Sequence, residues 1–172
     1  LDLSLPLGRQ SQFCIRDSNI SDSLSESSSS RSKKGTYPNL SGTVLLAEDN
    51  VVNQTLVSRM LKKFGASVVL ANDGVEACEC CHETIPDLIL MDVNMPNRNG
   101  IEAVRIIRES NMDVPIYALT AETDQKVIAE VMEAGSQGFL SKPVNKVKLY
   151  EVLEKHLKSP EELLMSPEPV EE

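Results

Sequence analysis

The sequence has no run of apolar residues long enough to cross a membrane. A spanning helix needs about 20 consecutive apolar residues, and no apolar run here approaches that length. The first residues, Leu1 to Gly8, also lack the basic start and the long apolar stretch of a secretory signal peptide. An initiator methionine is missing too, so we expect the chain to be part of a longer protein. We expect a cytoplasmic location, with no direct membrane contact in this part.

Positive charge is scarce as well. Lysine and arginine number 17 against 26 aspartates and glutamates, which gives a net charge of −9. Proteins that bind nucleic acid usually present a basic face, so this composition argues against a nucleic-acid partner. Five of the acids follow Lys158, at positions 161, 162, 168, 171 and 172. More than half of the net negative charge therefore lies in the C-terminal tail and says little about the core.

The sequence also lacks the paired cysteines of a structural zinc site. Cys78, Cys80, Cys81 and His82 form one close group, and Cys14 is distant from them in sequence. Zinc sites usually space one cysteine pair by about two to four residues and take a second pair of ligands from elsewhere in the chain. No second pair exists, so we interpret the group as thiols on a helix.

Composition divides the chain into three parts. Residues 1–41 include a serine-rich stretch from Ser21 to Ser32, typical of a flexible linker. Within this part, Leu1 to Gly8 alternates like a strand and is interpreted as the end of a preceding domain. Residues 42–158 carry the apolar pattern of one folded domain, and residues 159–172 are expected to form an acidic, disordered tail.

Short apolar runs alternate with helical patterns from Thr43 onward. We expect strands at 43–47, 67–70, 87–91, 115–119 and 138–141, and helices at 52–64, 74–83, 101–109, 121–134 and 146–157. In the first helix, Val57 and Leu61 are expected to face the core, and in the last helix Val147, Tyr150 and Leu153 should share one face. Strands that alternate with helices predict a doubly wound α/β fold, a parallel sheet with helices on both faces and right-handed crossovers.

Polar residues follow four of the predicted strands at the point where each strand ends. Glu48 and Asp49 follow the first strand, Asp92 the third, Thr120 the fourth and Lys142 the fifth. In such folds the carboxyl ends of the strands meet at one edge of the sheet. Acids crowded there need a cation, and oxygen ligands favour Mg²⁺. Asp92 could then act as a nucleophile toward a phosphoryl group, with a lysine and a hydroxyl holding its oxygens.

Four motifs in order resemble a receiver domain of two-component signalling over residues 44–157. They are Leu45-Leu46-Ala47-Glu48-Asp49-Asn50-x-x-Asn53-Gln54, Leu90-Met91-Asp92-x-x-Met95-Pro96-x-x-x-Gly100, Ala118-Leu119-Thr120-Ala121 and Gly138-Phe139-Leu140-Ser141-Lys142-Pro143. The resemblance implies a flavodoxin-like sheet with the strand order 2-1-3-4-5. It also implies that Asp92 accepts the phosphoryl group.

The resemblance assigns a role to each polar residue of these motifs. Asp49, the Asp92 carboxylate and the backbone carbonyl of Asn94 would bind Mg²⁺ directly, and Glu48 would act through a metal-bound water. Thr120 and Lys142 would hold the phosphoryl oxygens.

The resemblance also implies a conformational switch. Phosphorylation would draw Thr120 toward the phosphoryl group and leave room for Phe139 to turn inward. The alternative for Phe139 is ordinary core packing. The bond between Lys142 and Pro143 is expected to be cis. Asn94 and Glu122, two residues after Asp92 and Thr120, are expected to tune the loss of the phosphoryl group by orienting water.

The first motif is most similar to receivers fused to hybrid histidine kinases. Leu3 to Leu7 is similar to the last strand of a histidine-kinase ATP-binding domain, which favours the C-terminal receiver of such a kinase. The parent would then be a membrane-bound sensor kinase whose cytosolic part includes this chain. The partner would be a histidine-phosphotransfer helical bundle or the kinase's own dimerisation helices. Val52 and Leu56, on the first helix, are the candidate contacts.

Four other functions deserve comparison. A stand-alone response regulator would carry the same site. A kinase acting through His82 is disfavoured, because no nucleotide-binding motif is visible and His82 lies within the receiver pattern. The chain alone is thus expected to gain and lose a phosphoryl group without using ATP. An Asp-dependent phosphatase typically needs a second acid two residues after the nucleophile, where Asn94 stands. A degenerate receiver that only binds partners would not need the intact acids, threonine and lysine.

Overall fold

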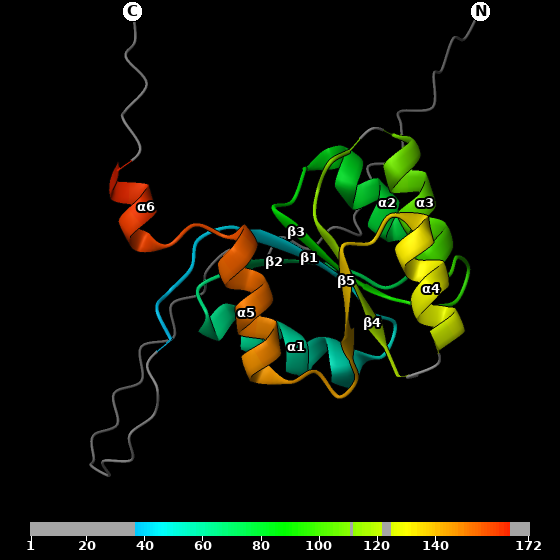
Figure 1. The fold of residues 1–172 in the computed structure, drawn as a ribbon, viewed down its shortest axis with the longest axis horizontal. Coiled ribbons are helices and arrows are strands. Elements are labelled where there is room, and N and C mark those ends of the chain that lie inside the picture. The colour runs from blue at the N-terminus through cyan, green and yellow to red at the C-terminus, as the bar shows by residue number, and fades with distance from the viewer. Residues whose placement is uncertain (1–36, 111, 122–124, 166–172) are drawn as a thin grey trace, which may run out of the picture.

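A five-stranded parallel sheet forms the centre of the molecule (Figure 1). The computed structural model describes residues 37–110, 112–121 and 125–165. The strands are β1 (Thr43–Ala47), β2 (Ser67–Ala71), β3 (Leu88–Asp92), β4 (Ile116–Thr120) and β5 (Gly138–Ser141). Their order is β2-β1-β3-β4-β5, and every neighbouring pair is parallel. The predicted doubly wound sheet and its strand order are confirmed.

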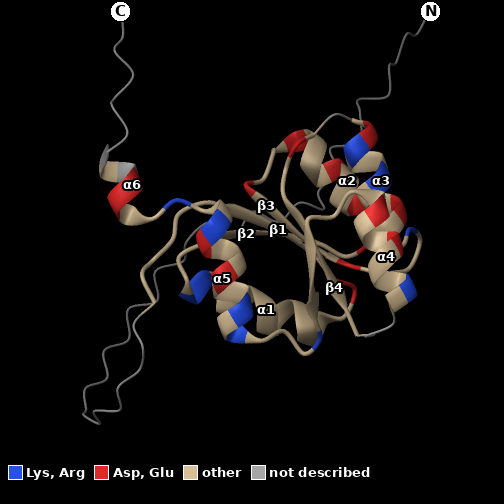
Figure 2. Ribbon diagram, in the orientation of Figure 1, with Lys and Arg blue, Asp and Glu red and all other residues tan. Residues whose placement is uncertain are grey.

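Helices cover both faces of this sheet, as the alternating pattern predicts. On one face lie α1 (Val51–Lys63) and α5 (Lys146–His156), and on the other lie α2 (Gly74–Glu83), α3 (Gly100–Glu109) and α4 (Gln125–Ala134) (Figure 1). Lysine, arginine, aspartate and glutamate lie mainly on the helices and loops (Figure 2). In the described residues, no helix is long and apolar enough to span a membrane.

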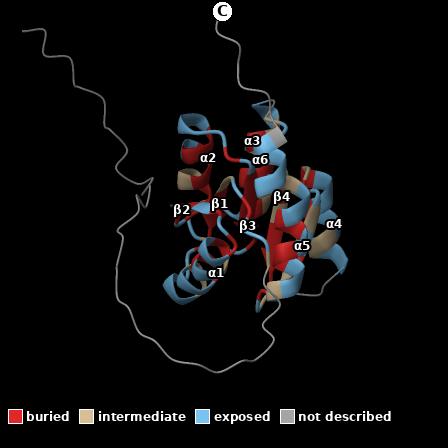
Figure 3. Cartoon of the chain, turned by 90° about the vertical axis from the view of Figure 1, so that its left-hand side faces the viewer, coloured by how far each residue is buried: buried red, intermediate tan, exposed pale blue. Residues whose placement is uncertain are grey.

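Alternate residues of the strands pack into two hydrophobic cores, one on each face of the sheet. Val44 and Leu46 of β1 pack with α1 and α5, whereas Leu45 packs with α2 and α3. This is the two-residue period of an extended chain. All five residues of β3 are buried, because β3 is the central strand with helices on both sides. Burial is concentrated in the sheet and the inner sides of the helices (Figure 3).

The predicted helices are present, but two details differ. The helix predicted from Ala121 begins at Gln125 as α4, because Ala121 lies in a bend and residues 122–124 fall outside the described residues. Val57 and Leu61 are buried at 2% and 0% exposure, as expected for the core side of α1. Tyr150 and Leu153 are buried on α5, but Val147 is 51% exposed. The placement of Val147 with them is therefore wrong: at about 100° per residue, Val147 lies about 160° around the helix axis from the fully buried Leu149 and so faces away from the core.

The three cysteines of the predicted group lie on α2 and are buried, and the prediction of free thiols holds for two of them. Cys78, Cys80 and Cys81 are at most 6% exposed, and Cys78 and Cys81 are free thiols. Burial raises the pKa of Cys78, and it raises the pKa of Cys81 to about 12. A thiolate is the form that binds metal, so Cys78 and Cys81 serve packing.

The packed unit begins before residue 42. Leu40 is 3% exposed within the core, and its N–H donates to the carbonyl of Phe64 at 2.6 Å. The ring of Tyr37 lies 5.2 Å from that of Phe64 and 4.6 Å from that of Tyr150. These five residues, 37–41, therefore belong to the folded unit rather than to a linker.

The two ends of this unit are joined by a backbone bridge. The N–H of Ser41 donates to the Lys158 carbonyl at 2.8 Å, and the N–H of Lys158 donates to the Ser41 carbonyl at 3.1 Å. The bridge lies next to the first residue of β1, at the end of the sheet opposite the carboxyl ends of the strands.

A short helix, α6 (Pro160–Met165), occupies part of the predicted disordered tail. The Ser159 N–H donates to the Glu162 carboxylate at 2.9 Å, and the Glu162 N–H donates to the Ser159 hydroxyl at 3.3 Å. This reciprocal capping box, with proline at the first helical position, starts a helix locally. The rest of the tail, 166–172, lies outside the described residues, as do residues 1–36.

Asp73 joins two loops beside the carboxyl ends of the strands. Its carboxylate accepts from the N–H groups of Val75 and Glu76 at 2.8 and 2.9 Å, which caps α2, and from the Asn97 amide at 2.6 Å. Burial alone would raise the pKa of Asp73, but the bonds from Glu76, Asn97 and Val75 outweigh it and lower the pKa.

We predict that Asp73→Ala lowers the free energy of unfolding at pH 7 by about 1–2 kcal/mol, the scale of a lost N-cap. The folded-state pKa is depressed, so this contribution is present above the ordinary aspartate pKa of about 4 and is lost as pH falls through the lowered value. Urea unfolding of wild type and variant from pH 7 to pH 2.5 measures it. Glu79→Ala, exposed on the same helix, is the control. A gap that persists undiminished at the acid end would contradict the assignment.

Candidate functional site

Four strand ends bring the predicted polar residues to one edge of the sheet. The parallel registers pair Ala47 with Met91, Asp92 with Leu119, and Thr120 with Ser141. Asp92 and Thr120 are the last residues of their strands, Glu48 and Lys142 follow theirs directly, and Asp49 comes one residue later. The edge thus collects four side chains from β1, β3, β4 and β5: Glu48, Asp92, Thr120 and Lys142.

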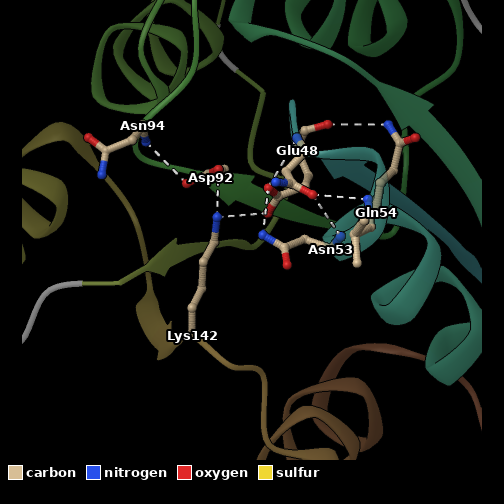
Figure 4. A network of polar contacts seen from close by, with 8 residues as sticks. Glu48, Asn53, Gln54, Asp92, Asn94 and Lys142 are labelled. Atoms are coloured by element: carbon tan, nitrogen blue, oxygen red, sulfur yellow. Dashed lines mark hydrogen bonds and ion pairs between the residues drawn. The ribbon is translucent and has the colours of Figure 1, made fainter.

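Lys142 lies between two buried carboxylates (Figure 4). Its Nζ is 2.6 Å from Asp92 Oδ2 and 2.7 Å from Glu48 Oε2. Glu48 is 1% exposed and Asp92 2%, whereas the lysine side chain is 18% exposed. The lysine therefore offsets two charges that burial would otherwise make costly.

Burial and the contacts with Lys142 shift the pKa of Asp92 in opposite directions, and burial and the contacts with the two acids do the same for Lys142. Burial raises the pKa of Asp92, and the neighbouring Glu48 charge adds to this, although Lys142 and the Asn94 N–H oppose it. Burial alone would lower the pKa of Lys142, but its contacts with Asp92 and Glu48 outweigh burial and raise that pKa. The lysine is thus held as a cation beside the aspartate.

The loop after β3 fixes the second oxygen of Asp92. The Asn94 N–H donates to Asp92 Oδ1 at 3.1 Å (Figure 4). Gly100 packs against the same turn: its N–H donates to the Val93 carbonyl at 2.9 Å. A Cβ at Gly100 would stand 2.1 Å from the Asp92 carbonyl oxygen. Only glycine allows this approach, which explains the place of Gly100 in its motif.

The first turn of α1 holds Glu48 from the other side. Glu48 Oε1 accepts from the Asn50 N–H at 3.3 Å and from the Asn53 amide at 3.2 Å. The Gln54 amide donates to the Glu48 carbonyl at 3.2 Å and to Asn72 Oδ1 at 3.3 Å. The sequence motif contains Asn53 and Gln54, but spacing alone did not give them roles. No contact with Gln54 was predicted for Asn72, because that contact depends on how the loop after β2 folds.

Three carboxylates are placed to hold a cation. One oxygen each of Glu48, Asp49 and Asp92 lies within 4.8 Å of the others. Lys142 Nζ is close to Glu48 Oε2, but the angles are not those of a hydrogen bond, so this buried oxygen has no hydrogen-bond partner in the described structure. Among the described residues this is the one group of three or more histidine, cysteine, aspartate or glutamate side chains close enough to share an ion. Hard oxygen donors suit Mg²⁺, so the residues fit that ion.

The remaining predicted residues occupy different surroundings. Thr120 is buried at 2% exposure at the end of β4, and Phe139 on β5 is 43% exposed, which does not fit full core packing. The bond between Lys142 and Pro143 is cis, as expected. Glu122 lies outside the described residues.

A small apolar-lined cavity opens beside this site. It has a volume of about 30 Å³ and lies between α1 and the loop after β5. Its lining consists of Glu48, Asn53, Leu56, Val57, Lys142, Pro143 and Val144. Leu56 is 45% exposed, and Val52, one turn earlier on α1, is 75% exposed. Both predicted contact residues are therefore accessible, and Leu56 borders the cavity.

Sequence comparison finds one family and several curated relatives. The response regulator receiver domain matches residues 44–154. Transcription factor SKN7 of Candida albicans is 35% identical over 150 residues, covering 87% of this chain and 27% of that protein. Hybrid signal transduction histidine kinase I of Dictyostelium discoideum is 38% identical over 119 residues, covering 64% of this chain and 7% of that protein. The chain thus spans well under a third of the length of these relatives.

Solved structures share the fold. The receiver domain of sensor histidine kinase PA1611 from Pseudomonas aeruginosa, with a magnesium ion coordinated in its active-site cleft, has a TM-score of 0.63 and 37% identity, covering 67% of this chain and 97% of that one. The co-crystal structure of Saccharomyces cerevisiae Ypd1 with the Ssk1 receiver domain contains a chain with a TM-score of 0.63 and 33% identity, covering 70% of this chain and 90% of that one. Together with the sequence match, these structures show that the chain belongs to the response regulator receiver domain family of two-component systems.

Proposed function

We propose that this receiver accepts a phosphoryl group on Asp92 from a phosphohistidine. A carboxylate oxygen of Asp92 attacks phosphorus, the bond between phosphorus and the histidine nitrogen breaks, and the departing imidazole takes the electron pair. The product is an acyl phosphate. The observation that carries this proposal is the buried Asp92 carboxylate, 2.6 Å from Lys142 Nζ and grouped with two further acids.

The same acids would hold Mg²⁺. Asp49, Asp92 and the backbone carbonyl of Asn94 would be direct ligands, and Glu48 would act through a bound water. When bound, the ion would offset negative charge on the acceptor and on the transferred group. The magnesium-containing PA1611 receiver supports this assignment by similarity.

Lys142 and Thr120 would hold the phosphoryl oxygens. Lys142 is already at the acceptor, and Thr120 ends the neighbouring strand. Movement of Thr120 toward the phosphoryl group would leave room for the exposed Phe139 ring to turn inward. The surface of α4, β5 and α5 would then change shape, so that a local change in charge biases a two-state element.

The donor would be a histidine-phosphotransfer bundle or the dimerisation helices of a kinase. The likeness to the Ssk1 receiver, which was crystallised with the phosphotransfer protein Ypd1, supports the first. We place this receiver in a hybrid histidine kinase, at the cytoplasmic side. The match to SKN7 over 87% of the chain favours a second candidate, a receiver within a transcription factor. The sequence of the flanking regions would distinguish the two.

Incubation with acetyl phosphate and Mg²⁺ should label Asp92. We expect an acid-stable, base-labile phosphoryl group, detected by mass spectrometry, that disappears in Asp92→Asn and on removal of Mg²⁺ by chelation. Glu154→Gln, an acid-to-amide change at an exposed position of α5, is the matched control. Label that survives in Asp92→Asn would refute the site, and steady turnover of small phosphate esters would favour a phosphatase instead. A receiver that only binds partners would show no label.

Leu56 should matter for transfer from a protein donor but not from a small one. Truncating an apolar contact in an interface commonly costs more than about 1 kcal/mol, so Leu56→Asp should slow transfer from a phosphorylated phosphotransfer protein roughly tenfold. Its rate with acetyl phosphate should match wild type. Leu164→Asp, at an 87% exposed leucine of α6, controls for the new charge. An unimpaired protein-donor rate in Leu56→Asp would exclude Leu56 from the interface.

Asn94 and Glu122 should set how long the phosphoryl group lasts. The Asn94 side chain is exposed beside Asp92 and can orient a water toward phosphorus. Replacing both residues, Asn94→Leu with Glu122→Leu, should lengthen the phosphoryl half-life about tenfold, the low end of the contribution from positioned acid–base groups. The decay of isolated labelled protein measures this, with Glu133→Leu on α4 as control. An unchanged half-life in the double variant would show that Asn94 and Glu122 do not control loss of the phosphoryl group.

A further inference from the structure

The two oxygens of Glu48 have different partners: Oε2 has an ion pair and Oε1 has hydrogen-bond donors. Lys142 Nζ lies 2.7 Å from Oε2, whereas the Asn53 amide donates to Oε1 at 3.2 Å and the Asn50 N–H to the same oxygen at 3.3 Å (Figure 4). Glu48 is 1% exposed, so water offers little replacement for any of these partners. A buried charge that loses a partner is strongly unfavourable.

Several acceptors share the Lys142 ammonium group. It contacts both Glu48 and Asp92, and the proposed reaction adds phosphoryl oxygens that also require it. Lys142 donates a hydrogen bond to Asp92 but makes only an ion pair with Glu48 Oε2, so the contact with Glu48 is the one that a turn toward the phosphoryl oxygens would weaken. Glu48 must then be held by the donors on its other oxygen.

We propose that Asn53 is a positioning residue for phosphoryl transfer: by holding Glu48 Oε1, it frees Lys142 to bind the phosphoryl oxygens. This inference rests on the proposed function. Asn53 itself does not touch the reacting atoms and acts through Glu48 and Lys142.

The local structure keeps the Asn53 amide in place. Asn50 caps α1, and its side chain accepts the N–H groups of Val52 at 2.9 Å and Asn53 at 3.3 Å. Asn53 is therefore fixed in the first turn, facing back to the end of β1. The next residue, Gln54, holds the main-chain carbonyl of Glu48 at 3.2 Å. Successive residues of one helix thus hold the side chain and the backbone of the same acid.

Asn53 also suits its position chemically. It is half-buried beside the small cavity that Leu56, Val57 and Val144 line. An aspartate at this position would add a fourth acid next to Glu48 and Asp92 and would repel Oε1. A neutral amide donates without adding charge.

Asn53→Leu tests the proposal, because leucine has a similar volume but cannot donate. Initial rates over a range of acetyl phosphate concentrations, with saturating Mg²⁺, should show a maximal phosphorylation rate about tenfold lower. The concentration for half-maximal rate should change less than about twofold, since donor binding does not involve Asn53. Thr55→Val, on the exposed side of α1, should match wild type.

A spectroscopic measurement in the Mg²⁺-free, unphosphorylated protein is independent of activity. The ammonium ¹H–¹⁵N resonance of Lys142, assigned by its loss in Lys142→Arg, should shift in Asn53→Leu as the lysine moves toward Glu48. It should stay in place in Thr55→Val. Asn53→Ala should show both effects in the same direction, and alanine is favourable in helices, so it serves if Asn53→Leu does not fold.

Each outcome bears on a different part of the proposal. A lower rate together with a shifted ammonium resonance supports it. Either effect without the other overturns it, as does a loss carried by the half-maximal concentration. If wild type takes up no phosphoryl group, the proposed function fails, and the resonance alone then shows whether Asn53 controls Lys142 through Glu48.

Discussion

Two buried carboxylates that share one lysine are the constraint on which this site depends. Glu48 and Asp92 end adjacent parallel strands and are nearly inaccessible to water, so each requires a cation and fixed donors. Lys142 supplies the cation from β5, and the first turn of α1 and the loop after β3 supply the donors. Even Gly100 follows from this constraint, because a side chain there would displace the backbone of Asp92.

Most of the fold could be predicted from the sequence, since the elements are locally encoded. The runs from Thr43 and Leu88 are short, apolar and bounded by polar residues, as expected for strands buried on both faces. Val57 and Leu61 carry the helical period of α1. Once the strands are predicted to be parallel, their carboxyl ends must meet, and this geometric rule predicts that Asp92 and Lys142 lie together.

What could not be predicted depends on side-chain direction and on contacts distant in sequence. Tyr37 and Leu40 sit beside a serine-rich segment, and nothing local shows that they pack on Phe64. Val147 is exposed because the buried face of α5 is centred on Leu149 and Leu153, which the spacing of Val147, Tyr150 and Leu153 alone did not indicate. By contrast, the spacing of Ser159 and Glu162 is that of a capping box and predicts a helix start locally. The acidic composition of the tail instead favoured a prediction of disorder. The role of Asn53 needs the distance to Glu48, which no spacing rule provides.

The bridge between Ser41 and Lys158 has a consequence for how such a unit is built into longer proteins. Because these two residues exchange backbone hydrogen bonds, the polypeptide enters and leaves the folded unit at neighbouring points. A unit of this kind can be inserted between other segments without forcing them apart, and its removal leaves ends that a short connection could join. Since that junction lies away from the carboxyl ends of the strands, additions on either side leave the edge with Asp92 and Lys142 open. The receiver is thus a portable module, in keeping with relatives of very different overall size.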